Sequence, residues 1–339
     1  MIPYQVVTGT TVLVGVATAV ALVYLYQKKK KEIIPWSWEE VGTLKQLYLY
    51  PLKSGHRVEL IKAECTEFGL KQTEDDEKLL QMRDRGLVVY TEKDKEFRSA
   101  RTYPKMVLID VGVHDENHLA VDAATMRTLY VEIPTKNEGN EITITLHKGE
   151  KLQAIDCGDE AALWFSRYIL EKDTGLRLGY HDGSYRRDLT KTHKTLLDFY
   201  KNLTNDSTGL YSDLTSTNLI NQASVNDLNT KLTNSNVTVN NFRPNFVVDG
   251  PSIQPYEEET WQWVKIGDVV LRNVKECTRC IMTTIDPDSG AKNSEREPLE
   301  TLETYHISNG PFPLPVMGIG LEVRKTGFVS VGDKVLVSK

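Results

Sequence analysis

The first 27 residues contain no charged side chain, and most of them form one apolar run, VVTGTTVLVGVATAVALVYLY, from Val6 to Tyr26. A helix of about 20 apolar residues is long enough to cross the hydrocarbon core of a bilayer. Four lysines, Lys28 to Lys31, follow directly, and basic residues beside a membrane helix stay on the cytosolic side. We therefore predict a single-pass membrane anchor over residues 1–31, with the folded body facing the cytosol.

A cleaved secretory signal is the alternative interpretation of this run. Such a signal has basic residues before its apolar core and small residues at a cleavage site after it. Here the charges come after the core, and the core ends in the bulky residues Tyr24, Leu25 and Tyr26. These features favour an anchor that is not removed.

The remaining chain has the composition of ordinary globular domains. The 339 residues are 40% hydrophobic, which is enough for two modest domains with cores of their own. Lys and Arg number 41 against 47 Asp and Glu, a net charge of −6, so no overall positive field attracts nucleic acid. Four cysteines without regular spacing do not form a disulfide framework and suit a reducing compartment.

The pattern of apolar residues predicts a mixed fold. An alternating strand begins at Val41, breaks at Pro51 and resumes beyond Gly55. Residues 106–146 hold short strand patterns at the spacing of an antiparallel meander, and residues 159–172 have helical periodicity with acidic residues in the first turn.

The second half begins with a polar connector over residues 184–205, whose Arg186 and Arg187 we expect on a solvated face. Beyond it we predict a strand and then a helix opened by Ser224, with Asp227 at the capping-box position. Strand patterns near the C-terminus would complete a barrel-like body.

The stretch that carries the chemistry contains a C-x-x-C pair, Cys277 and Cys280, flanked by Lys275 and Arg279. Cations beside a thiol are expected to depress its pKa and to make it a soft metal ligand or a nucleophile. Three alternatives remain open from the residues alone. A redox dithiol needs an exchange partner, a zinc site needs four ligands, and two buried structural thiols need neither.

The run CTRCIMTTIDPDSG from Cys277, followed by EPLETL from Glu297, closely resembles the MOSC-domain molybdenum enzymes called mitochondrial amidoxime-reducing components. The resemblance covers the chain from Val41 to its end. It implies an α+β fold, with a MOSC N-terminal β-rich domain at residues 41–178 and a MOSC β-barrel-like domain with flanking helices at residues 185–339. It also implies that the anchor lies in the mitochondrial outer membrane.

The same resemblance implies a site for a molybdenum–molybdopterin cofactor. The second cysteine of the pair binds molybdenum in that family, so Cys280 would be the metal ligand and a catalytic residue. Asp213 and Asp286 are our candidates for proton delivery. The residues expected to bind the cofactor are Lys53 and Ser54 in YPLKS, Arg85, Asp213, Thr215, Arg243 in NFRPN, Thr278, Arg279, Cys280 and Gly320.

The function implied is reduction of small N-hydroxylated compounds, such as amidoximes, hydroxamic acids and N-hydroxylamines, with nitrite reduction to nitric oxide as a side activity. The sequence has no C-x-x-C-H haem site, no G-x-G-x-x-G loop and no iron–sulfur cysteine set. Electrons would therefore come from partners, which the resemblance implies are cytochrome b5 and NADH-cytochrome b5 reductase. The alternative is a MOSC module that carries the cofactor or sulfur without catalysis.

Overall fold

The computed structural model describes residues 33–73, 80–134 and 141–339. The chain divides into an N-terminal unit that ends at Ser37 and a large unit from Trp38 to Lys339. Within the described ranges no helix is both long and apolar enough to cross a bilayer. The predicted anchor, residues 1–31, lies outside the described residues.

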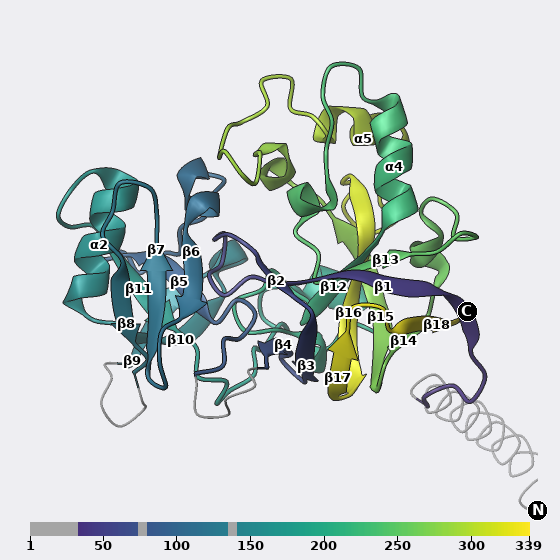
Figure 1. Ribbon diagram of the computed structural model, residues 1–339, viewed down its shortest axis with the longest axis horizontal. Helices are drawn as coiled ribbons and strands as arrows, with labels where there is room; N and C mark the ends of the chain where they lie inside the picture. The colour runs from purple at the N-terminus through teal and green to yellow at the C-terminus, as the bar shows by residue number, and fades with distance from the viewer. Residues whose placement is uncertain (1–32, 74–79, 135–140) are drawn as a thin grey trace, which may run out of the picture. The chain divides into compact units, whose positions relative to one another are not determined.

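The largest sheet of the second unit closes into a barrel, because one strand, β1, pairs at both ends of the strand order (Figure 1). In the order β13-β12-β16-β15-β14-β18-β1, seven strands close when β1 pairs with β13, and β2 extends the sheet beyond β1. The strands are β1 (Glu39–Leu49), β2 (Val58–Leu60), β12 (Thr217–Asn221), β13 (Phe246–Asp249), β14 (Trp263–Ile266), β15 (Val269–Thr278), β16 (Val316–Lys325) and β18 (Lys334–Ser338).

Three smaller sheets are built from residues before the connector, apart from one C-terminal strand, β17. A four-stranded sheet has the order β5-β11-β10-β9, and two three-stranded sheets have the orders β6-β7-β8 and β17-β3-β4. Their strands are β3 (Lys62–Thr66), β4 (Gly69–Gln72), β5 (Leu87–Thr91), β6 (Asp110–Val113), β7 (His118–Asp122), β8 (Leu129–Glu132), β9 (Glu141–Thr145), β10 (Lys151–Asp156), β11 (Leu176–Tyr180) and β17 (Gly327–Ser330). With the helices this confirms the α+β class.

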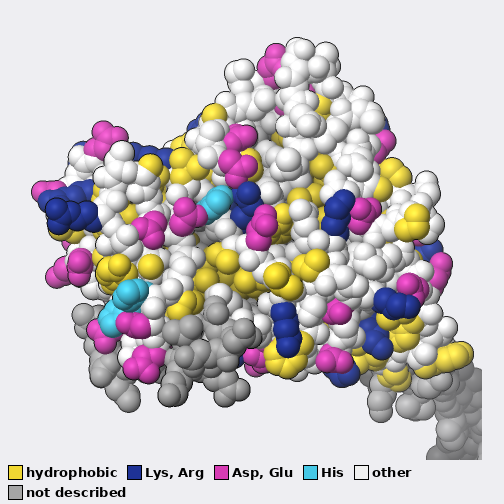
Figure 2. All heavy atoms as spheres, viewed as in Figure 1, with side chains coloured by type: hydrophobic (Ala, Val, Ile, Leu, Met, Phe, Trp, Pro, Cys, Tyr) yellow, Lys and Arg dark blue, Asp and Glu magenta, His cyan; other side chains and the backbone are white. Residues whose placement is uncertain are grey.

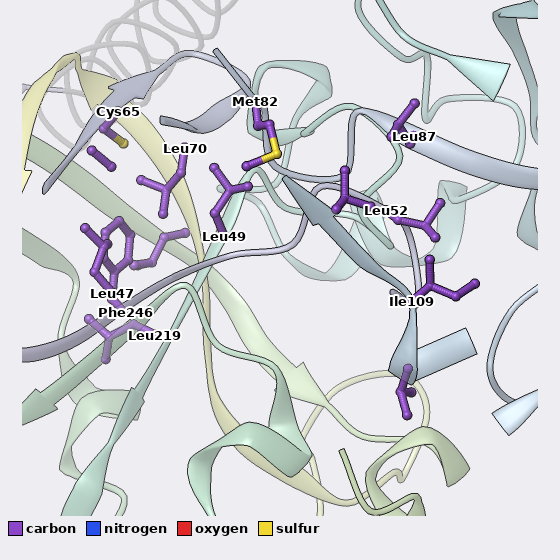
Figure 3. Packing of buried hydrophobic residues seen from close by; sticks show 14 of the residues in the cluster. Leu47, Leu49, Leu52, Cys65, Leu70, Met82, Leu87, Ile109, Leu219 and Phe246 are labelled. Carbon is purple, nitrogen blue, oxygen red and sulfur yellow. The ribbon is translucent and has the colours of Figure 1, made fainter. Parts of the chain in front are cut away.

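The main core follows β1 and the chain just beyond it. Leu47 packs with Phe246 and Leu219 of the barrel, whereas Leu52 lies on the side of Leu87 and Ile109 (Figure 3). All six side chains are almost fully buried. One apolar cluster therefore joins the barrel to the smaller sheets.

The helices of the described chain are α2 (Asp159–Leu170), α3 (Lys194–Phe199), α4 (Gln222–Lys231) and α5 (Leu299–Tyr305). The predicted start of α4 at Ser224 is wrong. The side chain of Asn221 caps the helix by accepting a hydrogen bond from the Ala223 N–H at 2.9 Å. The Ser224 hydroxyl instead donates to the buried carboxylate of Glu258.

We expect Gly42→Ala to weaken barrel closure. A Cβ at Gly42 would lie 2.3 Å from the Asp249 carbonyl oxygen, so β1 and β13 would have to separate. Overpacking of this kind costs about 1–3 kcal/mol of unfolding free energy. Gly112→Ala in β6 is the matched control, because a Cβ there meets no atom within 4 Å. Chemical denaturation measures both variants, and equal midpoints would contradict this account of closure.

We expect Glu258 to make stability fall as pH rises. The side chain is fully buried, and this burial raises its pKa from 4.5 to about 7. Between these values the folded state binds more protons than the unfolded state, so stability is lost on raising the pH, by roughly 3 kcal/mol in total. Glu258→Gln should remove this loss between pH 5 and 8 in urea denaturation. Glu116→Gln, at an exposed position, should keep it.

Candidate functional site

A cavity of about 220 Å³ collects most of the side chains that the sequence singles out. Nine of the eleven predicted site residues line it: Lys53, Ser54, Arg85, Asp213, Thr215, Arg243, Thr278, Arg279 and Cys280. The lining holds six Lys and Arg side chains against one carboxylate. By contrast, the face of the molecule in Figure 2 carries basic and acidic side chains interspersed. The cavity lining is therefore more basic than this face of the molecule.

Cys280 lies where β15 ends and a short 3-10 helix begins. Its carbonyl accepts hydrogen bonds from the Thr283 N–H at 3.0 Å and the Thr283 hydroxyl at 3.1 Å, and these bonds hold the turn. Cys280 is exposed to the cavity, whereas Cys277 is half-buried. Cys280 is therefore the more exposed residue of the pair.

The expected depression of the thiol pKa is wrong for Cys280. Although its surface opens to the cavity, the thiol lies among many protein atoms, and the shortage of water around it raises its pKa. The flanking cations oppose this only weakly. Arg279 donates to the carbonyls of Met317 at 2.9 Å and Phe242 at 2.7 Å, and the Lys275 ammonium donates to a backbone carbonyl. Both are held by the backbone.

Lys53 and Asp213 form an ion pair inside the cavity. The buried Lys53 ammonium lies 2.6 Å from the Asp213 carboxylate and 2.8 Å from the Tyr211 carbonyl oxygen. The charge of Lys53 holds the pKa of Asp213 well below its usual range. Asp213 is therefore ionised at neutral pH, and its side chain is 74% exposed, which also favours the charged form.

Two arginines share one aromatic ring at the cavity wall. The guanidinium carbons of Arg85 and Arg243 lie 4.5 Å and 4.2 Å from the centroid of the Tyr50 ring. Arg85 pairs with Asp84, but Nη2 of Arg243 is buried without any hydrogen-bond partner. Burial lowers the pKa of Arg243 to about 10. A buried, unpartnered guanidinium N–H marks a place for an anion.

The structure does not bring the two remaining predicted residues into the cavity lining. The carboxylate of Asp286 accepts hydrogen bonds from the N–H and hydroxyl of Ser289 at 2.7 Å and 2.8 Å, so it stabilises its own turn. Gly320 lies in β16 behind Thr215. A Cβ there would be 2.8 Å from the Thr215 side chain, so Gly320 makes room for a residue that lines the cavity.

A buried ion pair that the sequence did not predict supports the cavity wall near Asp213. Arg187 donates to both carboxylate oxygens of Glu150, at 2.9 Å and 2.6 Å, and also to the carbonyls of Ser212 and Asp213. The expectation that Arg187 is solvated is wrong, since it is 2% exposed. No local pattern could reveal the pair, because its partners lie 37 residues apart.

Arg101 and His147 are also part of the lining, and no sequence motif pointed to His147. In the ranges that the structure describes, no three His, Cys, Asp or Glu side chains are grouped as metal ligands. A metal held at Cys280 would therefore need most of its ligands from a cofactor.

Comparisons with known proteins identify both domains of the chain. Residues 41–172 match the model of the MOSC N-terminal beta barrel domain, and residues 206–336 match that of the MOSC domain. The chain is 34% identical to mitochondrial amidoxime reducing component 2 of Rattus norvegicus, over 88% of this chain and 83% of that protein. It is 33% identical to mitochondrial amidoxime-reducing component 1 of Danio rerio, over 96% and 92% of the two chains.

The corresponding human protein, component 1 of Homo sapiens, is 33% identical over 88% of this chain and 83% of its own length. The match thus extends over both MOSC regions and over the segment between them. The chain belongs to the mitochondrial amidoxime-reducing component family of MOSC-domain proteins.

Proposed function

We propose that this protein is a molybdenum-cofactor-dependent reductase of N-hydroxylated compounds such as amidoximes, hydroxamic acids and N-hydroxylamines. The observation that carries the proposal is an exposed cysteine, Cys280, in a cavity lined by six basic side chains and one carboxylate. The names of its relatives, which are amidoxime-reducing components, support the same reaction.

The residues present fit a molybdenum–molybdopterin cofactor. Thiolate sulfur is a ligand that suits redox metals such as molybdenum, so Cys280 would be its one protein ligand. Arg243, with its unpartnered N–H, and Arg85 would bind the phosphate of the pterin. Lys53, Ser54, Thr215, Thr278 and Arg279 would surround the rest of the cofactor. When bound, this group supplies the two electrons that cleave an N–O bond.

The protein's own groups would handle the protons of this reaction. Reduction of R–NH–OH to R–NH₂ and water consumes two electrons and two protons. Because Lys53 holds the pKa of Asp213 well below its usual range, this carboxylate would stay charged and would accept hydrogen bonds from water molecules, orienting them to deliver protons to the departing oxygen. Lys53 holds this carboxylate in place at 2.6 Å. Asp286 has no such position, because its carboxylate belongs to a turn.

Partners and location complete the proposal. Cytochrome b5 and NADH-cytochrome b5 reductase would supply the electrons, since the sequence has no haem, nucleotide or iron–sulfur motif. The anchor of residues 1–31 would hold the protein in the mitochondrial outer membrane with its body in the cytosol. The names of the relatives, which are mitochondrial components, agree with that location. Nitrite is a further substrate of the same site.

Cys280→Ser should abolish bound molybdenum and benzamidoxime reduction, because a serine oxygen is a harder and poorer ligand. Cys277→Ser is the matched control and should keep both, because Cys277 is the less exposed residue of the pair. Elemental analysis and turnover with added cytochrome b5 and its NADH-dependent reductase measure the outcome. Wild-type protein that holds molybdenum but reduces no N-hydroxylated compound would instead support a carrier.

Arg243→Gln should lower the amount of cofactor retained on purification by about tenfold, the effect of losing one charged hydrogen bond to phosphate. Arg296→Gln removes an arginine that pairs with Glu300 and Glu303 on the surface, so its cofactor content should match the wild type. Fluorescence of the oxidised pterin quantifies both. Equal contents in the two variants would remove Arg243 from the cofactor site.

A further inference from the structure

Two residues of the cavity lining, Arg101 and His147, have no role in the proposed function. We call them the Arg101 wall of the cavity. Arg101 follows β5 in a turn, and His147 begins the short 3-10 helix η2 (His147–Gly149) after β9. Both line the same cavity as Cys280 and Asp213. The Arg101 wall therefore faces the place where a substrate would meet the metal.

Arg101 carries a positive charge without a carboxylate partner among the described residues. Its guanidinium contacts the His147 ring, where Nη2 lies against both ring nitrogens, Nε2 and, at 2.8 Å, Nδ1. A guanidinium has five N–H donors in a planar fork. Within the part of the chain that the structure describes, most of these donors have no partner, and the side chain is only half-buried.

His147 does not neutralise the charge of Arg101, but it positions the guanidinium group. Because a guanidinium only donates hydrogen bonds, the ring must offer a lone pair and is therefore neutral. Burial, together with the nearby charges of Lys53 and Arg101, lowers the pKa of His147 to about 4. The ring also packs edge-on against Phe97, with centroids 4.3 Å apart. Its position is thereby fixed on two sides.

The turn that carries His147 is held by a buried ion pair. Glu150 directly follows η2 and is held by the buried Arg187, which also donates to the carbonyl of Asp213. His147 lies 3.8 Å from the Asp213 carboxylate. Arg187 thus connects the two sides of this part of the cavity.

The charges around Arg101 leave it able to attract an anion. Asp213 is the nearby carboxylate in the lining, and Lys53 neutralises it at 2.6 Å. Arg101 contributes to the electrostatic field at both the Cys280 thiol and Asp213, so it acts at the reacting end. The proposed phosphate ligands, Arg85 and Arg243, are instead grouped on Tyr50.

We infer that Arg101, aimed by His147, is a subsite for the carboxylate of an N-hydroxylated substrate. This inference rests on the proposed function, and it narrows the substrate class to N-hydroxylated acids. A planar guanidinium fork matches a carboxylate with two parallel hydrogen bonds. Arg101 is then a specificity-determining residue, and His147 is a positioning residue.

The test compares neutral benzamidoxime with its meta- and para-carboxylated forms. Wild-type enzyme should show a higher kcat/KM for at least one carboxylated isomer. Arg101→Gln should raise the KM for that isomer at least about tenfold, the effect of a lost charge-assisted hydrogen bond, with kcat unchanged. Its KM for benzamidoxime should change less than about twofold. Arg98→Gln, which removes a neighbouring arginine outside the cavity lining, is the control and should behave as wild type.

A binding measurement separates this inference from the proposed function. Carboxybenzamides cannot be reduced at an N–O bond, and calorimetry should show them binding wild-type protein more tightly than benzamide, with the difference lost in Arg101→Gln. That result in a protein that reduces no amidoxime would overturn the function and support the subsite. No preference for either carboxylated isomer, or a loss of molybdenum in Arg101→Gln but not Arg98→Gln, would overturn the subsite.

The positioning role of His147 has its own readout. His147→Leu removes the acceptor for Arg101 and should raise the KM for the carboxylated isomer in the same direction as Arg101→Gln. His147→Gln keeps an acceptor and should restore most of the preference. If both variants retain the wild-type KM, or both lose kcat for benzamidoxime equally, His147 does not act through Arg101.

Discussion

The pairing of β1 with both β18 and β13 is the constraint on which the site depends. β1 closes the barrel, and the residues after it pass straight into the cavity wall. Backbone bonds then clamp this segment: the Leu87 N–H donates to Pro51 at 2.9 Å, and the Lys53 N–H donates to Leu87 at 2.8 Å. The position of the Lys53 ammonium therefore follows from the closure of a barrel whose other strands lie more than 160 residues away in sequence.

Only some of the basic side chains in the cavity remain available to a ligand. Lys53 is neutralised by Asp213, and Arg279 is occupied by backbone carbonyls. Arg243 and Arg101 have no carboxylate partner in residues 33–73, 80–134 and 141–339, and each is held by an uncharged ring, the phenol of Tyr50 or the imidazole of His147. An aromatic or neutral support fixes a guanidinium without cancelling its charge. Such a cavity has two places for anionic groups, which suits a cofactor phosphate and a substrate acid.

Sequence patterns located the site residues that belong to short local motifs. Cys280 stands in a C-x-x-C pair, and Arg243 stands before a proline at a strand entrance; both line the cavity. Features set by contacts between distant segments could not be predicted. The Arg187–Glu150 pair and the withdrawal of Arg279 onto Met317 depend on how the barrel meets the smaller sheets. The flanking charges predicted a depressed pKa for the Cys280 thiol, whereas its pKa is raised. The sequence does not tell where the side chains of these cations point.

Strained backbone conformations indicate that the site residues are held in place before a ligand binds. Ser54, Arg85 and Arg243 all line the cavity and all have positive φ, at 70°, 48° and 54°. A non-glycine residue in this region costs of order 1–3 kcal/mol, and it persists only where its surroundings determine the conformation. Here the surroundings are the bonds from Arg85 to Tyr50 and to the carbonyl of Arg243. The groups proposed to bind anions are thus set in advance by the fold, and a bound cofactor would not have to order them, so its affinity would be high and its release slow.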